Sequence, residues 1–121
     1  MFTFTAGFIV GRLLFGGYFF MMGLNHFFKH KMLSGYAKSK GVPFPEIAVA
    51  GSGLLIFLGG LGTALGMFPQ VSAVLISIFL LFVTPKMHAF WKETDPNMKM
   101  MEMVQFMKNT ALFGASLMIA F

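Results

Sequence analysis

Charged side chains are too scarce in this sequence to cover a soluble domain. Nine Lys and Arg and four Asp and Glu make up 11% of the 121 residues, whereas 57% are hydrophobic. A soluble domain carries charge at about a quarter of its positions, because its surface must be hydrated. The 17 Phe residues also provide ample apolar surface to bury, which excludes a disordered chain. The sequence therefore predicts an integral membrane protein whose exterior faces lipid.

The apolar stretches predict an all-α fold, a four-helix transmembrane bundle with two cytoplasmic loops. A membrane-spanning helix needs about 20 mostly apolar residues. Four stretches qualify, at about residues 7–28, 46–66, 70–90 and 103–121. Pro69 is expected to start a helix after a tight turn, where its missing N–H costs nothing. Residues 41–45 are expected to be extended, because a residue that precedes proline is disfavoured in the helical region.

The charges predict the orientation of these spans. All four acids and seven lysines fall on the side of the two longer connections; the lysines are Lys29, Lys31, Lys38, Lys40, Lys86, Lys92 and Lys99. Positive charge accumulates on the cytoplasmic side of a membrane, so both loops are expected inside the cell and both termini outside. We predict a multi-pass protein of the inner or plasma membrane. The net charge of +5 is consistent with this orientation and with attraction to the lipid bilayer, which we predict as a partner. It requires no nucleic-acid partner.

Small residues predict where the helices approach one another. In the second span, Glu46, Ala50, Gly53, Gly60 and Ala64 fall on one helical face. Small side chains allow close backbone contact, which is a main source of helix association in lipid. Gly7 and Gly11 have the GxxxG spacing and suggest a similar face in the first span.

The absence of cysteine excludes several chemistries. A chain with no Cys has no disulfide, thiolate nucleophile, CxxC redox pair or thiolate metal site.

Polar residues near the cytoplasmic ends of the spans are the candidate site. Polar groups inside a membrane are costly and therefore candidates for function. Helical side chains lean toward the helix N-terminus, so His26 and His88, which close the first and third spans, should point into the membrane. Glu102, Gln105, Asn109 and Ser116 share one face of the fourth helix. The predicted ligand-binding residues are His26, His88, Asn109, Asn25, Gln105, Trp91 and Arg12.

Three interpretations of this polar group remain open. Histidines and an amide beside aromatic rings suit a quinone headgroup as the cofactor, through hydrogen bonds and proton exchange. The same residues could form an internal hydrogen-bond network that only fixes helix register. A metal ion is the third, but no metal ligands are predicted, because the two histidines and a carboxylate would have to meet through the fold. Arg12 either reaches the outer headgroups or makes bidentate bonds inside the bundle, and the face that it shares with Gly16 and His26 favours the second.

The sequence resembles the DoxX family over nearly its whole length. The segments that carry the resemblance are Gly11-Arg12-Leu13, Gly23-Leu24-Asn25-His26-Phe27, Lys40-Gly41-Val42-Pro43, Gly59-Gly60, Gly66, His88-Ala89-Phe90-Trp91 with Asp95-Pro96, and Phe106-Met107-Lys108-Asn109 with Gly114. The resemblance implies one small four-span membrane domain over residues 1–121. It also implies a link to redox systems, either through quinone-dependent oxidation or as an anchor for thiol or superoxide defence enzymes. It carries no set of catalytic residues.

Three functions follow as hypotheses. The first is a quinone-linked component or partner of a membrane redox system. The second is a non-catalytic scaffold that anchors a soluble redox enzyme through its loops. The third is a small-molecule exporter, which comes last because the predicted spans carry Asp and Glu only at their edges. Whether the chain itself is an enzyme stays open, and a homo-oligomer is compatible with the sequence.

Overall fold

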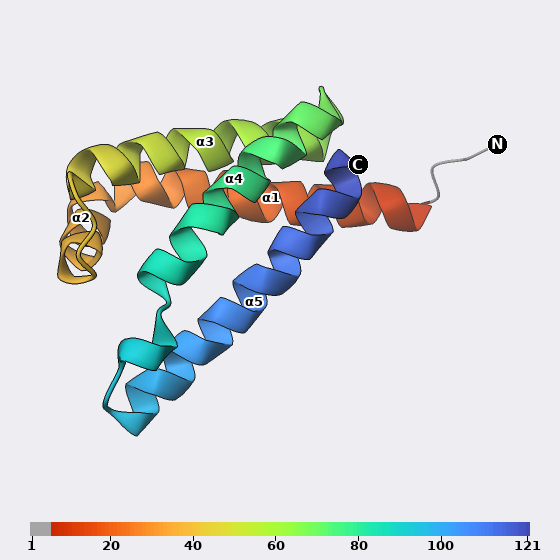
Figure 1. Cartoon of the computed structure of the whole chain (residues 1–121). Helices are drawn as coiled ribbons and strands as arrows, with labels where there is room; N and C mark the ends of the chain where they lie inside the picture. Colours follow the sequence, from red (N-terminus) through yellow and green to blue (C-terminus); the bar gives the residue numbers. More distant parts are fainter. Residues whose placement is uncertain (1–5) are drawn as a thin grey trace.

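The computed structural model describes residues 6–121, which form helices joined by short turns (Figure 1). In chain order the elements are α1 (Ala6–Phe28), α2 (His30–Ser39), α3 (Pro45–Leu65), α4 (Pro69–Met87), the 3-10 helix η1 (Phe90–Lys92) and α5 (Pro96–Ala120). No strand occurs in this described part of the chain. The predicted all-α fold is confirmed.

Three segments of residues 6–121 are long and apolar enough to cross a membrane. They are Ala6–Phe28, Pro45–Leu65 and Pro69–Lys92, the last of which runs from α4 into η1. These segments coincide with three of the predicted spans and support an integral membrane protein. The 25-residue α5 is not among them, because polar residues such as Gln105, Lys108 and Asn109 lower the mean hydropathy of its sequence. The fourth crossing, and with it the four-helix transmembrane bundle and the position of the loops, stays a prediction.

The connection predicted as a loop at residues 29–45 contains a helix instead. Leu33 and Ala37 lie one turn apart on α2 and are turned toward the rest of the protein, with Ala37 only 5% exposed. A short helix forms here because this apolar face can pack, and α2 does pack against α3. The prediction named no helix in this polar connection, whereas ten of its residues form one.

The residues before the two helix-starting prolines adopt a left-handed conformation. Phe44 has φ 48° and Phe68 has φ 46°, so the expected extended backbone is not found at Phe44. Each residue accepts the first hydrogen bond of the helix that follows, Phe44 from Ala48 and Phe68 from Ser72, both at 2.9 Å. Proline disfavours the right-handed helical region for the residue before it. The left-handed backbone of Phe44 and Phe68 still allows their carbonyl groups to accept these bonds. Pro69 begins α4 as predicted.

The long helices form two antiparallel pairs. Figure 1 shows α1 beside α3 and α4 beside α5, with the second pair running at an angle to the first. The pairs meet mainly where α4 packs on α3. Phe19 of α1, Ile56 of α3 and the α4 residues Ile76, Phe79 and Leu80 form the core at this junction.

Glycines fix how closely α1 approaches α3. A Cβ atom on Gly60 would lie 2.3 Å from the backbone nitrogen of Phe20, and one on Gly16 would lie 2.4 Å from that of Ala64. Both distances are far below van der Waals contact, so the two backbones touch directly. The predicted small-residue face of the second span, with Gly53, Gly60 and Ala64 at its centre, is confirmed as a packing surface.

The GxxxG motif of α1 lies outside this contact. Gly7 is exposed, and a Cβ atom on Gly11 would meet nothing within 4 Å. The close approach uses Gly16 and Gly23 instead, which are both buried. Their seven-residue spacing places them on the same face of the helix, two turns apart, whereas Gly7 and Gly11 precede the region where α3 lies closest.

Candidate functional site

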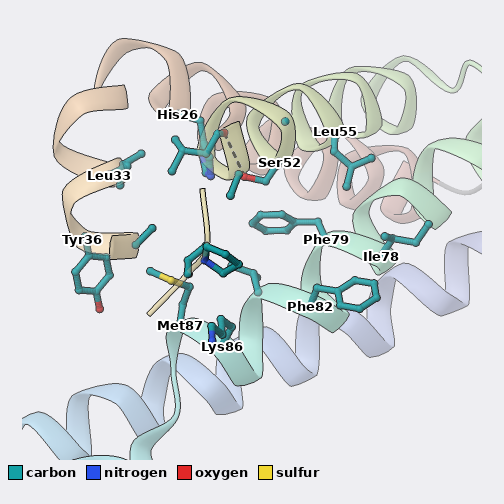
Figure 2. A pocket seen from close by; sticks show the side chains of 17 residues that line it. His26, Leu33, Tyr36, Ser52, Leu55, Ile78, Phe79, Phe82, Lys86 and Met87 are labelled. Carbon is teal, nitrogen blue, oxygen red and sulfur yellow. Dashed lines mark hydrogen bonds between the residues drawn. The ribbon is translucent and has the colours of Figure 1, made fainter. Parts of the chain in front are cut away.

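A cleft of about 510 Å³ lies among α1, α2, α3 and α4. Most of its lining is apolar, with Leu33 from α2, Leu55 from α3, and Phe79 and Phe82 from α4 (Figure 2). The loop residues Val42 and Pro43 line it between α2 and α3. We call this space the His26 cleft, after the histidine that α1 contributes to it.

His26 is held in place by its own helix and by its neighbours. Its Nδ1 lies 2.8 Å from the carbonyl oxygen of Met22, and its ring meets the Phe79 ring edge-on at 6.1 Å. Gly53 makes room for it, because a Cβ atom there would lie 2.5 Å from the Cβ of His26. The ring points into the cleft in Figure 2, as its position near the end of α1 predicts.

Three further polar side chains line the His26 cleft. Ser52 donates a hydrogen bond to the carbonyl oxygen of Val49 at 3.2 Å. Tyr36 lies at the margin of the cleft, and Lys86 lies in the last turn of α4 (Figure 2). The cleft thus combines a large apolar surface with a few polar groups, which is the usual composition of a small-molecule site.

A buried carboxylate next to the cleft joins α5 to α2. Glu102 is only 4% exposed, and its Oε2 is bonded by Lys40 Nζ and, at 3.4 Å, by the Tyr36 hydroxyl. His88 Nδ1 lies 3.2 Å from the other oxygen, Oε1. Lys40 also binds Glu93 at 3.2 Å. We call these five residues the Glu102 cluster.

The charges of the Glu102 cluster stabilise one another. Burial alone would raise the pKa of Glu102, but the hydrogen bonds from Lys40 and His88 outweigh it and hold the pKa below its ordinary value. Burial would lower the pKa of Lys40, but its bonds to Glu102 and Glu93 raise it above the ordinary value. Burial, together with the charge of Glu102, raises the pKa of Tyr36. At neutral pH an ammonium group therefore meets an ionised carboxylate and a neutral phenol.

The structure does not bring all seven predicted residues into one pocket. His26 lines the cleft, whereas His88 binds Glu102 and Asn109 lines a smaller hollow of about 220 Å³ between α4 and α5, beside Thr84 and Phe106. The two hollows are lined by different residues of α4. His88 directly follows Met87, the last residue of α4, and its side chain is turned to Glu102 instead of the cleft.

The remaining predicted residues lie outside the His26 cleft. Trp91 is exposed and meets the Phe106 ring edge-on at 5.7 Å. Gln105 is half-buried on α5, and Asn25 is exposed. Arg12 lies against Gly66 at the other end of α1, where a Cβ atom on Gly66 would be 2.7 Å from Nη1. Its guanidinium also lies 6.0 Å from the centre of the Phe8 ring.

Tyr36, Lys40 and Glu102 were not among the predicted site residues. The sequence holds part of the signal, since Glu102, Asn109 and Ser116 lie on one predicted face of the last helix and all three are buried. Their partners could not be found in this way. Lys40 and Glu102 are 62 positions apart, and only the folding of α2 brings Lys40 to the carboxylate.

The greater part of the chain matches a known protein family. The model of the DoxX family matches residues 7–89. The chain belongs to the DoxX family. No curated protein and no solved structure matches it. The segment matched to DoxX contains every residue that lines the His26 cleft, whereas Glu102 and the whole of α5 follow it.

Proposed function

We propose that this DoxX protein is a quinone-linked component or partner of a membrane redox system, and that the quinone headgroup binds in the His26 cleft. The observation that carries the proposal is the composition of the cleft, in which the His26 ring projects into a mostly apolar space. A quinone needs a site of this kind, because its ring and tail are apolar and its two oxygens require polar partners.

The dimensions and position of the cleft support the same ligand. Its volume of about 510 Å³ lies within the range of small-molecule sites, roughly 300–1,000 Å³. Phe79 and Phe82 offer aromatic faces to a planar ring. Ile78 and Phe82 line the cleft and are also 42% and 71% exposed, so the space opens on the side of α4 that faces lipid. A lipid-soluble ligand can therefore enter from the bilayer.

The proposal is tested by the quinone that the protein retains. The protein is extracted into lipid nanodiscs, and bound quinones are quantified by mass spectrometry. We expect His26→Ala to reduce the total quinone retained, counted over its oxidised and reduced forms, by about tenfold, the scale of one lost hydrogen bond inside an apolar site. Asn25→Ala, an exposed neighbour outside the cleft, is the matched control and should retain the wild-type amount. The absence of quinone from the wild-type protein, or equal retention by His26→Ala, contradicts the proposal.

The second candidate function is a scaffold that anchors a soluble redox enzyme. It is favoured by α2, which exposes two cationic side chains and one apolar side chain, those of Lys31, Lys38 and Met32. A mixed cationic and apolar surface of this kind suits an acidic partner. The same mass spectrometry separates the two functions, because a scaffold retains a defined protein in a fixed ratio, whereas a quinone-linked component retains the quinone.

A further inference from the structure

The hydrogen bonds around the His26 cleft have a common direction. In three of the polar side chains that line it, the hydrogen is already donated to the protein, and only lone pairs remain for a ligand. We infer that the His26 cleft selects the hydroxyl-bearing, reduced form of its ligand, a hydroquinone, over the corresponding quinone. This inference rests on the proposed function and specifies which form of the ligand the site holds.

The tautomer of His26 carries the argument. Its Nδ1 lies 2.8 Å from the carbonyl oxygen of Met22, and a carbonyl oxygen can only accept a hydrogen bond. The proton of the neutral imidazole must therefore be on Nδ1, which leaves Nε2 as a bare acceptor. Since the ring points into the cleft, this acceptor is the group that it offers to a ligand (Figure 2).

The hydroxyl groups of Ser52 and Tyr36 also donate their hydrogen to the protein and offer a ligand only lone pairs. The Ser52 hydroxyl donates to the carbonyl oxygen of Val49 at 3.2 Å, so its oxygen is left to accept. At the margin of the cleft, the Tyr36 hydroxyl donates to Glu102 at 3.4 Å. An ionised carboxylate has no hydrogen to give in return, so Tyr36 also presents lone pairs.

Few other donors are available along the cleft. The backbone N–H groups of α3 and α4 are engaged within their helices, Val42 donates to the carbonyl oxygen of Ala37 at 3.1 Å, and Pro43 has no N–H. Lys86, in the last turn of α4, is the one ammonium among the lining residues. Its charge also disfavours a cationic ligand, which would otherwise suit a site rich in acceptors.

A quinone and a hydroquinone meet this lining differently. Both oxygens of a quinone are acceptors, so a quinone bound here would face His26 and Ser52 with lone pairs against lone pairs. Each hydroxyl of a hydroquinone can donate one hydrogen bond and accept another. The reduced form therefore satisfies both the acceptors in the cleft and the ammonium of Lys86. An unsatisfied polar group in an apolar site is costly, which turns this difference into selectivity.

The test uses three probes with the same short alkyl tail: a benzoquinone, its hydroquinone and the dimethyl ether of that hydroquinone. Binding to the wild-type protein in nanodiscs is measured without oxygen. We expect the hydroquinone to bind at least about tenfold more tightly than the other two, since each hydrogen bond gained or left unmade changes affinity by about that factor. The ether should resemble the quinone, because it has the same shape as the hydroquinone but no O–H.

Variants of the lining residues show which side chains produce the preference for the hydroquinone. His26→Phe keeps a ring against Phe79 and removes the acceptor, so the ratio of hydroquinone to quinone affinity should fall by about tenfold. Tyr36→Phe should reduce the ratio less, because its hydroxyl lies at the margin. Phe82→Leu is the control within the cleft and should weaken all three probes equally, which leaves the ratio unchanged.

The outcomes separate this inference from the proposed function. Equal binding of quinone and hydroquinone, or tighter binding of the quinone, overturns the selectivity while the proposed function stands. If none of the three probes binds, the proposed function fails and this inference fails with it. An unchanged ratio in both His26→Phe and Tyr36→Phe overturns the assignment to these side chains. The comparison of probes on the wild-type protein needs no variant to fold.

Discussion

At the scale of single residues, the Glu102 carboxylate connects the polar side chains of its cluster. It is buried at the start of the apolar part of α5 and binds Lys40, His88 and Tyr36. A buried ion pair gains little over an apolar pair, but the removal of one partner leaves the other charge without compensation. The Lys40 side chain is 15% exposed, so its ammonium cannot turn fully to water.

We predict that Glu102→Gln lowers the free energy of unfolding by about 1–3 kcal/mol, because it removes the buried partner of the Lys40 ammonium and leaves it only the more exposed Glu93. Thermal melting in detergent measures the loss. Glu46→Gln is the matched control: the same chemical change at an exposed acid should alter stability by less than about 0.5 kcal/mol. Equal melting temperatures for the two variants would refute the role given to Glu102.

The pH dependence of this stability follows from the pKa directions. The pKa of Glu102 is lowered in the folded protein, so its contribution is present above the ordinary value of 4.5 and is lost as the pH falls through the folded value. The pKa of Lys40 is raised, so its contribution is present below 10.5 and is lost as the pH rises through the folded value. Glu102→Gln should remove the acid-side loss due to this group.

At the scale of helices, the glycine contact between α1 and α3 determines whether the first helix pair forms. Helix association in lipid depends on close packing, since lipid tails compete equally well for apolar side chains. Gly60 and Gly16 permit backbone contact where any Cβ atom would collide with the opposite helix.

Gly60→Ala should therefore destabilise the protein by about 1–3 kcal/mol, the usual cost of forcing an extra methyl group into a packed contact. Gly11→Ala has open space around its Cβ position and should cause no loss, because alanine favours a helix more than glycine does. The melting temperatures of the two variants in the same detergent measure this difference in stability. A loss at Gly11 as large as that at Gly60 would place the contact on the GxxxG motif after all.

Periodicity and length were sufficient to predict the helices with strong patterns. The three apolar segments and the small-residue face of α3 follow directly from the sequence, because each is local. Helix α2 was missed because a search for spans reads a ten-residue amphipathic stretch as polar. The position of His26 was predicted from side-chain direction, whereas its separation from Asn109 depends on which face of α4 each neighbouring helix covers. That choice is a property of tertiary packing.

At the scale of the whole molecule, topology is the property that most needs measurement. A chain without cysteine allows single cysteines to be introduced and labelled without background. We predict that Lys38→Cys and Lys92→Cys react with an impermeant reagent only after the membrane is permeabilised, and that Phe121→Cys reacts from outside in intact cells. Labelling of all three on one side would mean that α5 does not cross. External labelling of Lys38→Cys would reverse the orientation.

The sideways opening of the His26 cleft changes what competes for it. Ile78 and Phe82 are exposed where they line the cleft. Under the proposed function this opening faces the bilayer, so we expect lipid tails to fill the cleft in the absence of a ligand. An incoming tail exchanges one hydrocarbon neighbour for another and gains almost no transfer free energy. The headgroup alone then determines which ligand binds more tightly. Occupancy should follow the mole fraction of the ligand among the lipids and depend little on the length of its tail.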